Sequence, residues 1–277
     1  MIVSTGTSCF KPIQPDRLFK GKEISYQEHT PSTNLRAHIH CYWELKSLQR
    51  LLEPFVYYVV SDGCIDIFFD VNNPCAIDIM GLSNSYHTFT LPHHFHYMGI
   101  RFLPGTFASL FKLDVSELTG ACLPLNEVNR KLYQQLNETI LRSSYVSGTR
   151  FNRLIHPFVM ALDALFTRII TDHPPQTDFR FSLALDQMLS DKGSTAIEQL
   201  QVPVSPRHLR RLFKFYVGES PKAFSKIVRF QNLLNLQPTK ETLKREKFFY
   251  DLGYYDQAHF IKEFKTIYGL TPNIAFK

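Results

Sequence analysis

The stretch Gly253–Pro272 reads GYYDQAHFIKEFKTIYGLTP and places polar residues at the start of an apolar ridge. Asp256 is a candidate helix cap, because its carboxylate can accept the unpaired N–H groups of a first turn. This pattern predicts a helix whose back packs in a core and whose first two turns face a partner. After Asp256, polar residues alternate with apolar ones: Gln257, His259 and Lys262 with Phe260, Ile261 and Phe264.

A copy of this pattern lies 51 residues earlier, in LRRLFKFYVGESP at Leu209–Pro221. Two units are too few for a solenoid, which needs about three repeats. The sequence therefore predicts two copies of one helical module, joined by a helix. The copies agree at five pairs of positions: Leu209 and Phe260, Phe213 and Phe264, Lys214 and Lys265, Gly218 and Gly269, and Pro221 and Pro272.

Each copy has the features of a helix-turn-helix unit. Ser205 and Pro206 predict a helix start, because serine can cap a helix and proline at the first position loses no needed N–H group. A short helical segment and a turn precede each capped helix, in IEQLQVPV (197–204) and FFYDLGYY (248–255). In such units the second helix inserts its N-terminal residues into the major groove of DNA.

The side chains at the two helix starts suit contacts with DNA bases. A guanidinium can bond O6 and N7 of guanine together, glutamine can pair with adenine, and lysine can bind guanine or phosphate. Taken singly, each residue is better explained as an exposed polar residue of a surface helix, but the duplication and the net charge together favour DNA. The candidates for base contacts are Arg207, Arg210 and Arg211 in the first unit, and Gln257, His259 and Lys262 in the second.

A connecting helix is predicted to hold both units together. Ser220 and Pro221 repeat the capped start, and PKAFSKIVRFQNLLNLQ (221–237) carries an apolar face. Held this way, two recognition helices could enter successive major grooves, about 34 Å apart, on one face of the duplex. Four lysines are expected to contact phosphates, which adds affinity without specificity: Lys214, Lys222, Lys226 and Lys265.

The charge distribution agrees with a C-terminal module that faces a polyanion. From Ser194 onward the chain has 14 Lys and Arg against 7 Asp and Glu, while the first 193 residues have 17 against 18. The whole net charge of +6 therefore comes from the last third.

The five cysteines are an odd number without a CxxC spacing, which predicts no disulfide framework and a reducing compartment. Cys64 and Cys75 lie in apolar strand contexts and are expected in the core. No cysteine has basic neighbours that would activate it for a methyl-accepting role. The chain shows no secretory signal and no apolar run of about 18 residues. We expect a cytoplasmic protein without a membrane partner.

The N-terminal part is predicted to be an antiparallel β domain. Short runs rich in β-branched and aromatic residues, such as FVYYVV (55–60) and CIDIFFDV (64–71), are separated by the turn signals SDG and NNP. From about Asn126 the apolar period becomes helical, which predicts a helical hairpin over 126–171. Two prolines in TDHPPQTD then predict a linker over 172–178.

The segments VSPRHLRRLFKFYVGESPKAFSKIVRFQNLL and DLGYYDQAHFIKEFKTIYGLTP resemble the DNA-binding domain of AraC/XylS-type transcriptional regulators. The resemblance covers 179–277 and implies a seven-helix domain with two helix-turn-helix units. It also adds Ala258 to the base-reading residues named above. Pro203 stands where the family usually has glycine, and Phe249 where it has a small residue, so these departures put the local geometry of both units in question.

The segments YWELKS, SDGCIDIFFDV, IMGLS and GIRFLPGTFASLF resemble the sensor-like domain of one branch of these regulators. This likeness implies a cupin-like β-barrel over 1–125 that binds a ligand or mediates dimerisation, and hence an α+β chain. The resemblance further implies an activator rather than a repressor. Its partners would be promoter DNA, a small-molecule effector, RNA polymerase and a second copy of the chain. No cofactor is expected.

A metal-dependent enzyme of the cupin type is the alternative. In HIHCYWE, the even spacing predicts His38, His40 and Glu44 on one face of a strand, and this donor set suits Fe, Mn or Ni. A second cluster at His93, His94 and His96 could add a ligand. Against this, Ser32 stands where a cupin metal site has glycine, and Trp43 and Glu44 belong to the stretch that resembles the sensor domain.

Overall fold

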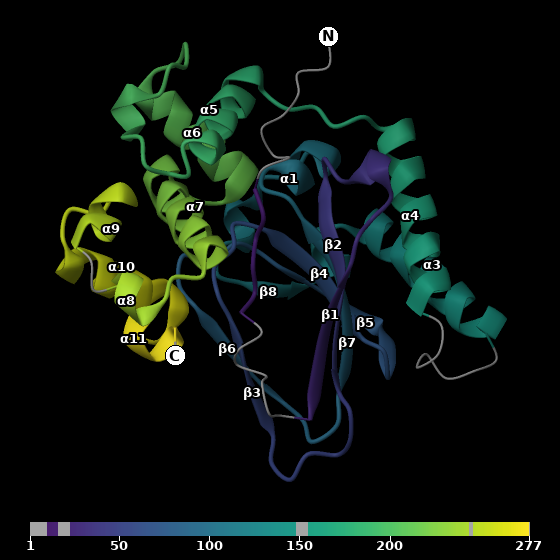
Figure 1. The fold of residues 1–277 in the computed structure, drawn as a ribbon. Coiled ribbons are helices and arrows are strands. Elements are labelled where there is room, and N and C mark those ends of the chain that lie inside the picture. The colour runs from purple at the N-terminus through teal and green to yellow at the C-terminus, as the bar shows by residue number, and fades with distance from the viewer. Residues whose placement is uncertain (1–9, 16–22, 148–154, 244–245, 277) are drawn as a thin grey trace.

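The computed structural model describes residues 10–15, 23–147, 155–243 and 246–276 (Figure 1). Two antiparallel sheets form the N-terminal part, so the predicted antiparallel architecture is confirmed. The ladders of the described strands form two separate sheets, and closure into a barrel stays a prediction. The six-stranded sheet has the order β1 (Ile24–His29), β2 (Ile39–Ser47), β7 (His96–Phe102), β4 (Ile65–Asp70), β5 (Asn73–Met80) and β8 (Cys122–Pro124), and the two-stranded sheet pairs β3 (Phe55–Val59) with β6 (His87–Leu91).

The six-stranded sheet has two different faces because side chains alternate along each strand. Ile65, Ile67 and Phe69 of β4 point into the main core. Asp66 and Phe68, between them, point to the other face, towards the two-stranded sheet. A second apolar cluster fills part of the space between the sheets.

Helices cover the main-core face of the sheet. The ring of Phe158 lies 5.9 Å from that of Phe69, and the ring of Phe166 lies 5.5 Å from that of Phe102. These contacts pack the predicted helical hairpin on the sheet (Figure 1). The elements of this layer are η3 (Thr33–Leu35), α1 (Thr106–Phe111), η4 (Val115–Leu118), α2 (Leu125–Val128), α3 (Arg130–Ser147) and α4 (Ile155–Asp172).

The described C-terminal part is helical. One group of helices, α5 to α7, shares the main core, and a separate apolar cluster joins the end of α7 to the last four helices. Among the described helices, none has the length and apolar character of a membrane span. The elements are α5 (Phe179–Ser190), η6 (Ile197–Gln199), α6 (Pro206–Val217), α7 (Pro221–Leu236), α8 (Lys240–Leu243), α9 (Glu246–Asp251), α10 (Gln257–Tyr268) and α11 (Pro272–Ala275).

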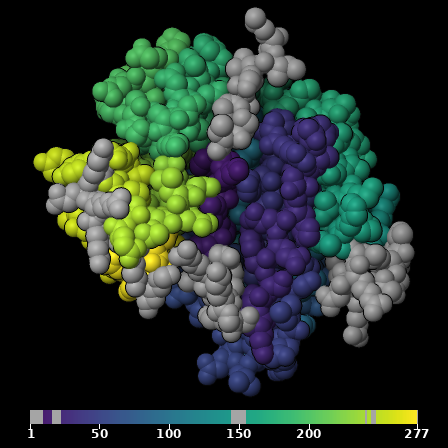
Figure 2. Space-filling model, in the orientation of Figure 1, coloured from purple at the N-terminus to yellow at the C-terminus, as the bar shows by residue number. Residues whose placement is uncertain are grey.

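The C-terminal helices pack directly on the N-terminal part (Figure 2). A Cβ atom at Gly105 would lie 2.6 Å from the ring of Phe181, so only glycine allows this approach without a shift. Thr119 Oγ1 donates a hydrogen bond of 2.8 Å to the carbonyl of Gly218, at the end of α6. The main core therefore continues from the sheet into the first helix-turn-helix unit.

The cysteines do not all lie where the sequence predicts. Cys41 and Cys64 are buried, and burial raises the pKa of both thiols. Cys75 and Cys122 are exposed, so the expectation of a core position is wrong for Cys75. Cys75 lies at the start of β5, where Asn73 and Ala76 are exposed as well. Cys9 lies outside the described residues.

Candidate nucleic-acid interface

The first unit presents a capped helix with its basic residues outside. Ser205 Oγ accepts a hydrogen bond of 3.3 Å from His208 N, and Pro206 occupies the first position of α6. At the other end Gly218 has φ 90°, which favours glycine, and its N–H closes the helix. Leu209, Phe213, Tyr216 and Val217 are buried, while Arg207, Arg210 and Arg211 are all exposed.

The second unit repeats this geometry at an offset of 51 residues. Asp256 Oδ1 accepts a hydrogen bond of 2.7 Å from His259 N, and Gly269 ends α10 with φ 87°. Both recognition helices have 12 residues. Their buried positions correspond, since Phe260, Phe264, Ile267 and Tyr268 face the core. On the outer side Gln257, Ala258 and Lys262 are exposed and His259 is half-buried.

The two departures from the family pattern have different outcomes. The helical segment expected before α6 is reduced to the 3-10 turn η6. Pro203 has no N–H group and disfavours a helical conformation in the residue before it, which explains why the helix does not continue. Phe249 fits without such a change: it is buried, and its ring lies 4.7 Å from that of Phe260.

Helix α7 connects the two units and contributes to both apolar cores. Ser220 Oγ accepts a hydrogen bond of 3.2 Å from Ala223 N at its start. Phe224, Ile227 and Val228 belong to the main core, whereas Phe230, Leu233 and Leu234 belong to the C-terminal cluster. Figure 1 shows α7 between α6 and α10. One continuous helix therefore determines how the two recognition helices sit relative to each other.

The four lysines assigned to phosphates differ in their surroundings. Lys214, Lys222 and Lys265 are exposed. Lys226 Nζ instead lies 3.1 Å from the buried carboxylate of Glu263.

Glu263 is a residue that the sequence analysis missed. It holds the position in α10 that Leu212 holds in α6, and its Oε2 also lies 3.5 Å from His259 Nε2. The sequence does contain a signal for it, because the repeat places a carboxylate at a position that is apolar in the first unit. Glu263 thus ties α7 to the recognition helix α10.

Two family matches agree with this geometry. Residues 201–277 match a family described as a helix-turn-helix domain. Residues 27–124 match a family described as a domain of unknown function (DUF6597). The C-terminal part of the chain is therefore a helix-turn-helix DNA-binding domain of the AraC type. No curated protein matches the chain in sequence.

Solved structures of ToxT from Vibrio cholerae are similar to this chain in outline. An apo ToxT variant from strain SCE256 is 10% identical, with 92% of this chain and 97% of the other covered and a TM-score of 0.44. ToxT from strain O395 is 14% identical, with 92% and 97% covered and a TM-score of 0.36. Wild-type ToxT from SCE256 with a bound unsaturated fatty acid is 10% identical, with 91% and 94% covered and a TM-score of 0.36.

The structure does not bring the predicted metal-binding triad together. The register of β2 against β7 shifts between Ile39 and Cys41, so simple alternation does not hold across the shift. Glu44 Oε1 lies 2.7 Å from His96 Nε2, whereas His40 Nε2 lies 3.8 Å from Glu28 Oε2. This corrects the spacing argument for His38, His40 and Glu44.

The second histidine cluster is also divided. His93 contacts the Leu51 carbonyl, His94 contacts Ser47 Oγ, and His96 contacts Glu44.

The protonation of these residues follows from their surroundings. Burial lowers the pKa of His38 and, together with the charge of Arg101, that of His40. Burial alone would raise the pKa of Glu44, but hydrogen bonds from His96 and Lys46 bring it below its usual value. Within the described part of the chain, one group of possible metal ligands has its atoms within 4.8 Å of one another: Glu28, His40 and Cys41. Arg101 Nη1 lies 3.5 Å from Glu28 Oε1, so a metal ion there would share that carboxylate with a guanidinium.

A cavity of about 220 Å³ lies between the two sheets. Trp43 forms part of its wall and lies over Gly99, where a Cβ atom would come within 2.3 Å of the indole ring. The absent side chain at position 99 therefore allows the indole to lie flat on the sheet. Trp43 Nε1 donates a hydrogen bond of 3.0 Å to Asp66 Oδ1 at the polar end of the cavity. The lining consists mainly of apolar and aromatic residues: Trp43, Leu45, Tyr57, Val59, Phe68, Met80, Phe89, Leu91 and Tyr97, with Thr90, Asp66 and Arg101 as polar members.

Arg101 is buried and lies among three carboxylates. Its Nε is 3.1 Å from Asp66 Oδ1 and 3.1 Å from Asp62 Oδ2, and its Nη1 is 3.5 Å from Glu28 Oε1. Burial raises the pKa of Asp66 to about 6 against the opposing effect of Arg101, and the nearby charge of Asp62 adds to the rise.

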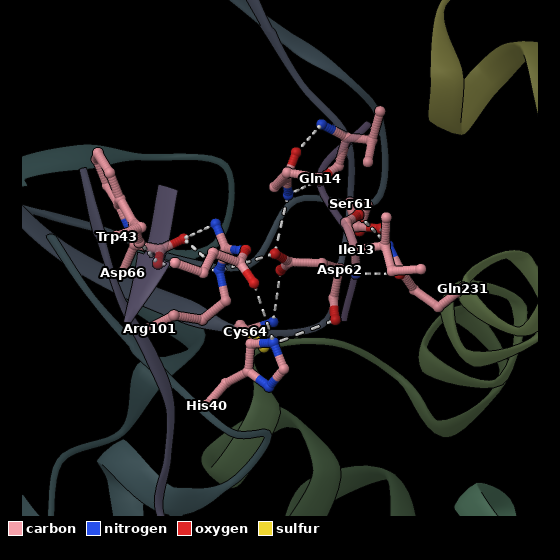
Figure 3. Close-up of polar contacts among 12 residues, drawn as sticks. Ile13, Gln14, His40, Trp43, Ser61, Asp62, Cys64, Asp66, Arg101 and Gln231 are labelled. Carbon is pink, nitrogen blue, oxygen red and sulfur yellow. Dashed lines mark hydrogen bonds and ion pairs between the residues drawn. The ribbon is translucent and has the colours of Figure 1, made fainter. Parts of the chain in front are cut away.

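A chain of hydrogen bonds continues from this cluster to α7 (Figure 3). Gln14 Nε2 donates to Asp62 Oδ2 at 2.9 Å and to the carbonyl of Val60 at 2.9 Å. Gln231 of α7 accepts from Ile13 N at 2.7 Å and donates to the carbonyl of Ser61 at 2.9 Å. The segment 13–14 and the loop 60–62 therefore lie between the cavity and the helix that joins the two units.

Proposed function

We propose that this chain is a transcription regulator that binds promoter DNA sequence-specifically, with the first turns of α6 and α10 in two successive major grooves. It activates transcription, through contact with RNA polymerase, in response to a small molecule held in the cavity. A dimer of the regulator would place two such pairs of helices on one promoter.

The exposure of equivalent polar residues on two equivalent helices carries this proposal. Arg207, Arg210 and Arg211 are exposed on α6, and Gln257, Ala258 and Lys262 are exposed on α10. Neither set is buried against the N-terminal part, so both are available to one duplex. Because α7 contributes to both cores, the two helices would meet DNA as one body.

The effector role is supported by the cavity and by its surroundings. Ligand sites are usually concave and apolar with a few polar groups, which describes the space between the sheets. Hydrogen bonds lead from its polar end through Gln14 to Gln231 of α7. The activator role rests on the family resemblance.

The test is selection of bound duplexes from a randomised library with the wild type, Arg210→Ala and Lys214→Ala. Loss of a bidentate arginine contact costs about 1–3 kcal/mol and relaxes specificity at one position. We expect Arg210→Ala to lose preference for one base pair. Lys214→Ala, on the same helix, should weaken all sequences alike and reduce the salt slope by about 1. An unchanged base preference in Arg210→Ala would refute the proposed readout.

A further inference from the structure

The walls of the cavity can attract positive charge as well as apolar surface. Trp43, Tyr57, Phe68, Phe89 and Tyr97 contribute aromatic rings to the lining. A cation over the face of such a ring is attracted by the ring electrons, and more strongly where water is excluded. The apolar surface at the same time favours a ligand with an apolar body.

The charged residues of the lining are Asp66 and Arg101, and Arg101 is shared with two further carboxylates outside the lining. Glu28, Asp62 and Asp66 all approach the single guanidinium of Arg101. The nearby His40 adds no compensating charge, since burial and Arg101 lower its pKa. A bound anion would add a fourth negative charge around Arg101, at the cost of burying it beside the carboxylates. A bound cation would instead supply the missing positive charge.

One oxygen of Asp66 is less well bonded than the other. Oδ1 accepts hydrogen bonds from Trp43 Nε1 at 3.0 Å and Arg101 Nε at 3.1 Å. Oδ2 has contacts with Arg101 of 3.4 Å. This oxygen can therefore accept a shorter, charge-assisted bond from a ligand. The raised pKa of Asp66 agrees with a carboxylate that Arg101 compensates only in part.

We propose that the cavity takes a small organic cation: a protonated amine on an apolar or aromatic group, with the ammonium against Asp66 and the body among the rings. This inference rests on the proposed effector role of the cavity. The volume of about 220 Å³ suits a single ring with a short side chain.

Trp43 provides a direct readout, because it is the single tryptophan of the chain and lines the cavity. The DNA-free protein is titrated with three probes of similar shape: 2-phenylethylamine, 2-phenylethanol and 3-phenylpropionate. A hydrogen bond to a charged group contributes about 1.5–3 kcal/mol. We therefore expect 2-phenylethylamine to change Trp43 fluorescence with at least roughly tenfold higher affinity than the alcohol. The propionate should bind most weakly.

Two variants locate the charge that is responsible. Asp66→Asn keeps the shape and should reduce the affinity for the amine to that of the alcohol. Asp70→Asn, on the same strand but outside the cavity, should leave the amine affinity unchanged. Stronger binding of the propionate, equal binding of all three probes, or no response to the amine would overturn the proposal.

A separate measurement distinguishes the ligand class from the effector role. Duplexes selected with the wild-type regulator are bound with and without 2-phenylethylamine. If the amine occupies the cavity and DNA binding does not change, the effector role fails while the ligand class stands. If DNA binding changes with the propionate alone, the ligand class fails while the effector role stands.

Discussion

Asp66 shows how burial and neighbouring charges compete at one residue. Water is largely excluded from its carboxylate, which favours the protonated form, while Arg101 favours the ionised form. Asp62 shares the same guanidinium and weakens its effect on Asp66. Burial prevails, and the pKa of Asp66 rises to about 6.

This shift predicts how Asp66 affects stability. The unfolded carboxyl has a pKa near 3.9, so the folded state binds the proton more tightly. The contribution of Asp66 to the free energy of unfolding is then fully present below about pH 4 and is lost as pH rises through about 6. We expect the free energy of unfolding of the wild type, relative to that of Asp66→Asn, to fall by about 1–3 kcal/mol from pH 4 to pH 7.5. Urea unfolding at both pH values measures it. A difference that stays constant, or that grows with pH, would contradict the assigned shift.

Glu263 is a second residue whose role depends on its surroundings. Its counterpart Leu212 is an ordinary apolar residue, whereas Glu263 is a buried carboxylate beside Lys226 and His259. The ammonium of Lys226 is therefore paired with a carboxylate of the protein, while its side chain remains 42% exposed. Among the four lysines, Lys226 therefore has a competing partner within the protein.

At the scale of elements, the caps of the two recognition helices can be tested separately from DNA binding. Ser205 and Asp256 each accept a hydrogen bond from the first turn. Replacing such a cap by alanine costs about 1 kcal/mol of stability. We expect Ser205→Ala and Asp256→Ala to reduce the free energy of unfolding by about this amount, as measured by urea titration.

Thr271→Ala is the matched control, because Thr271 precedes α11 without a side-chain cap hydrogen bond. Its effect should be smaller than that of the other two variants. If all three variants lose the same stability, the hydrogen bonds at Ser205 and Asp256 do not stabilise the recognition helices.

The recognition helices could be predicted from sequence because their determinants are local. Caps, C-terminal glycines and apolar spacing all lie within a few residues of α6 and α10. The metal-site alternative failed for a different reason. It assumed strict alternation along β2, and the register shift between Ile39 and Cys41 depends on the partner strand β7. Similarly, the cavity is lined by strands that are distant in sequence, so no single segment predicts it.

At the scale of the whole molecule, the N-terminal and DNA-binding parts are joined by one apolar core. The cluster contains Ile67 and Phe102 of the sheet together with Phe213 of α6 and Phe224 of α7. No sequence segment predicts this contact, since it joins residues more than 100 positions apart. A change in the sheet can therefore reach the first recognition helix through packed side chains.

Gln231 is the polar counterpart of this contact. Its side chain is 1% exposed and bonds to the backbone of Ile13 and Ser61. Gln231→Leu would leave these backbone groups buried without a partner, and each such group costs about 1–3 kcal/mol. We expect the free energy of unfolding to fall by about 2–3 kcal/mol. Hydrogen exchange should become faster in 10–15 and 60–62.

Asn232→Leu, at the next position of α7, controls for the change in side-chain type and should leave exchange in those segments unaltered.

The effect of Gln231→Leu on DNA binding distinguishes two roles for the contact between α7 and the N-terminal part. If docking of α7 restrains the two units, Gln231→Leu will raise the affinity for selected duplexes. If docking positions them for DNA, the affinity will fall. Unchanged exchange and unchanged affinity would show that the hydrogen bonds from Gln231 do not couple the N-terminal part to the helix-turn-helix units, and that the apolar core alone holds them together.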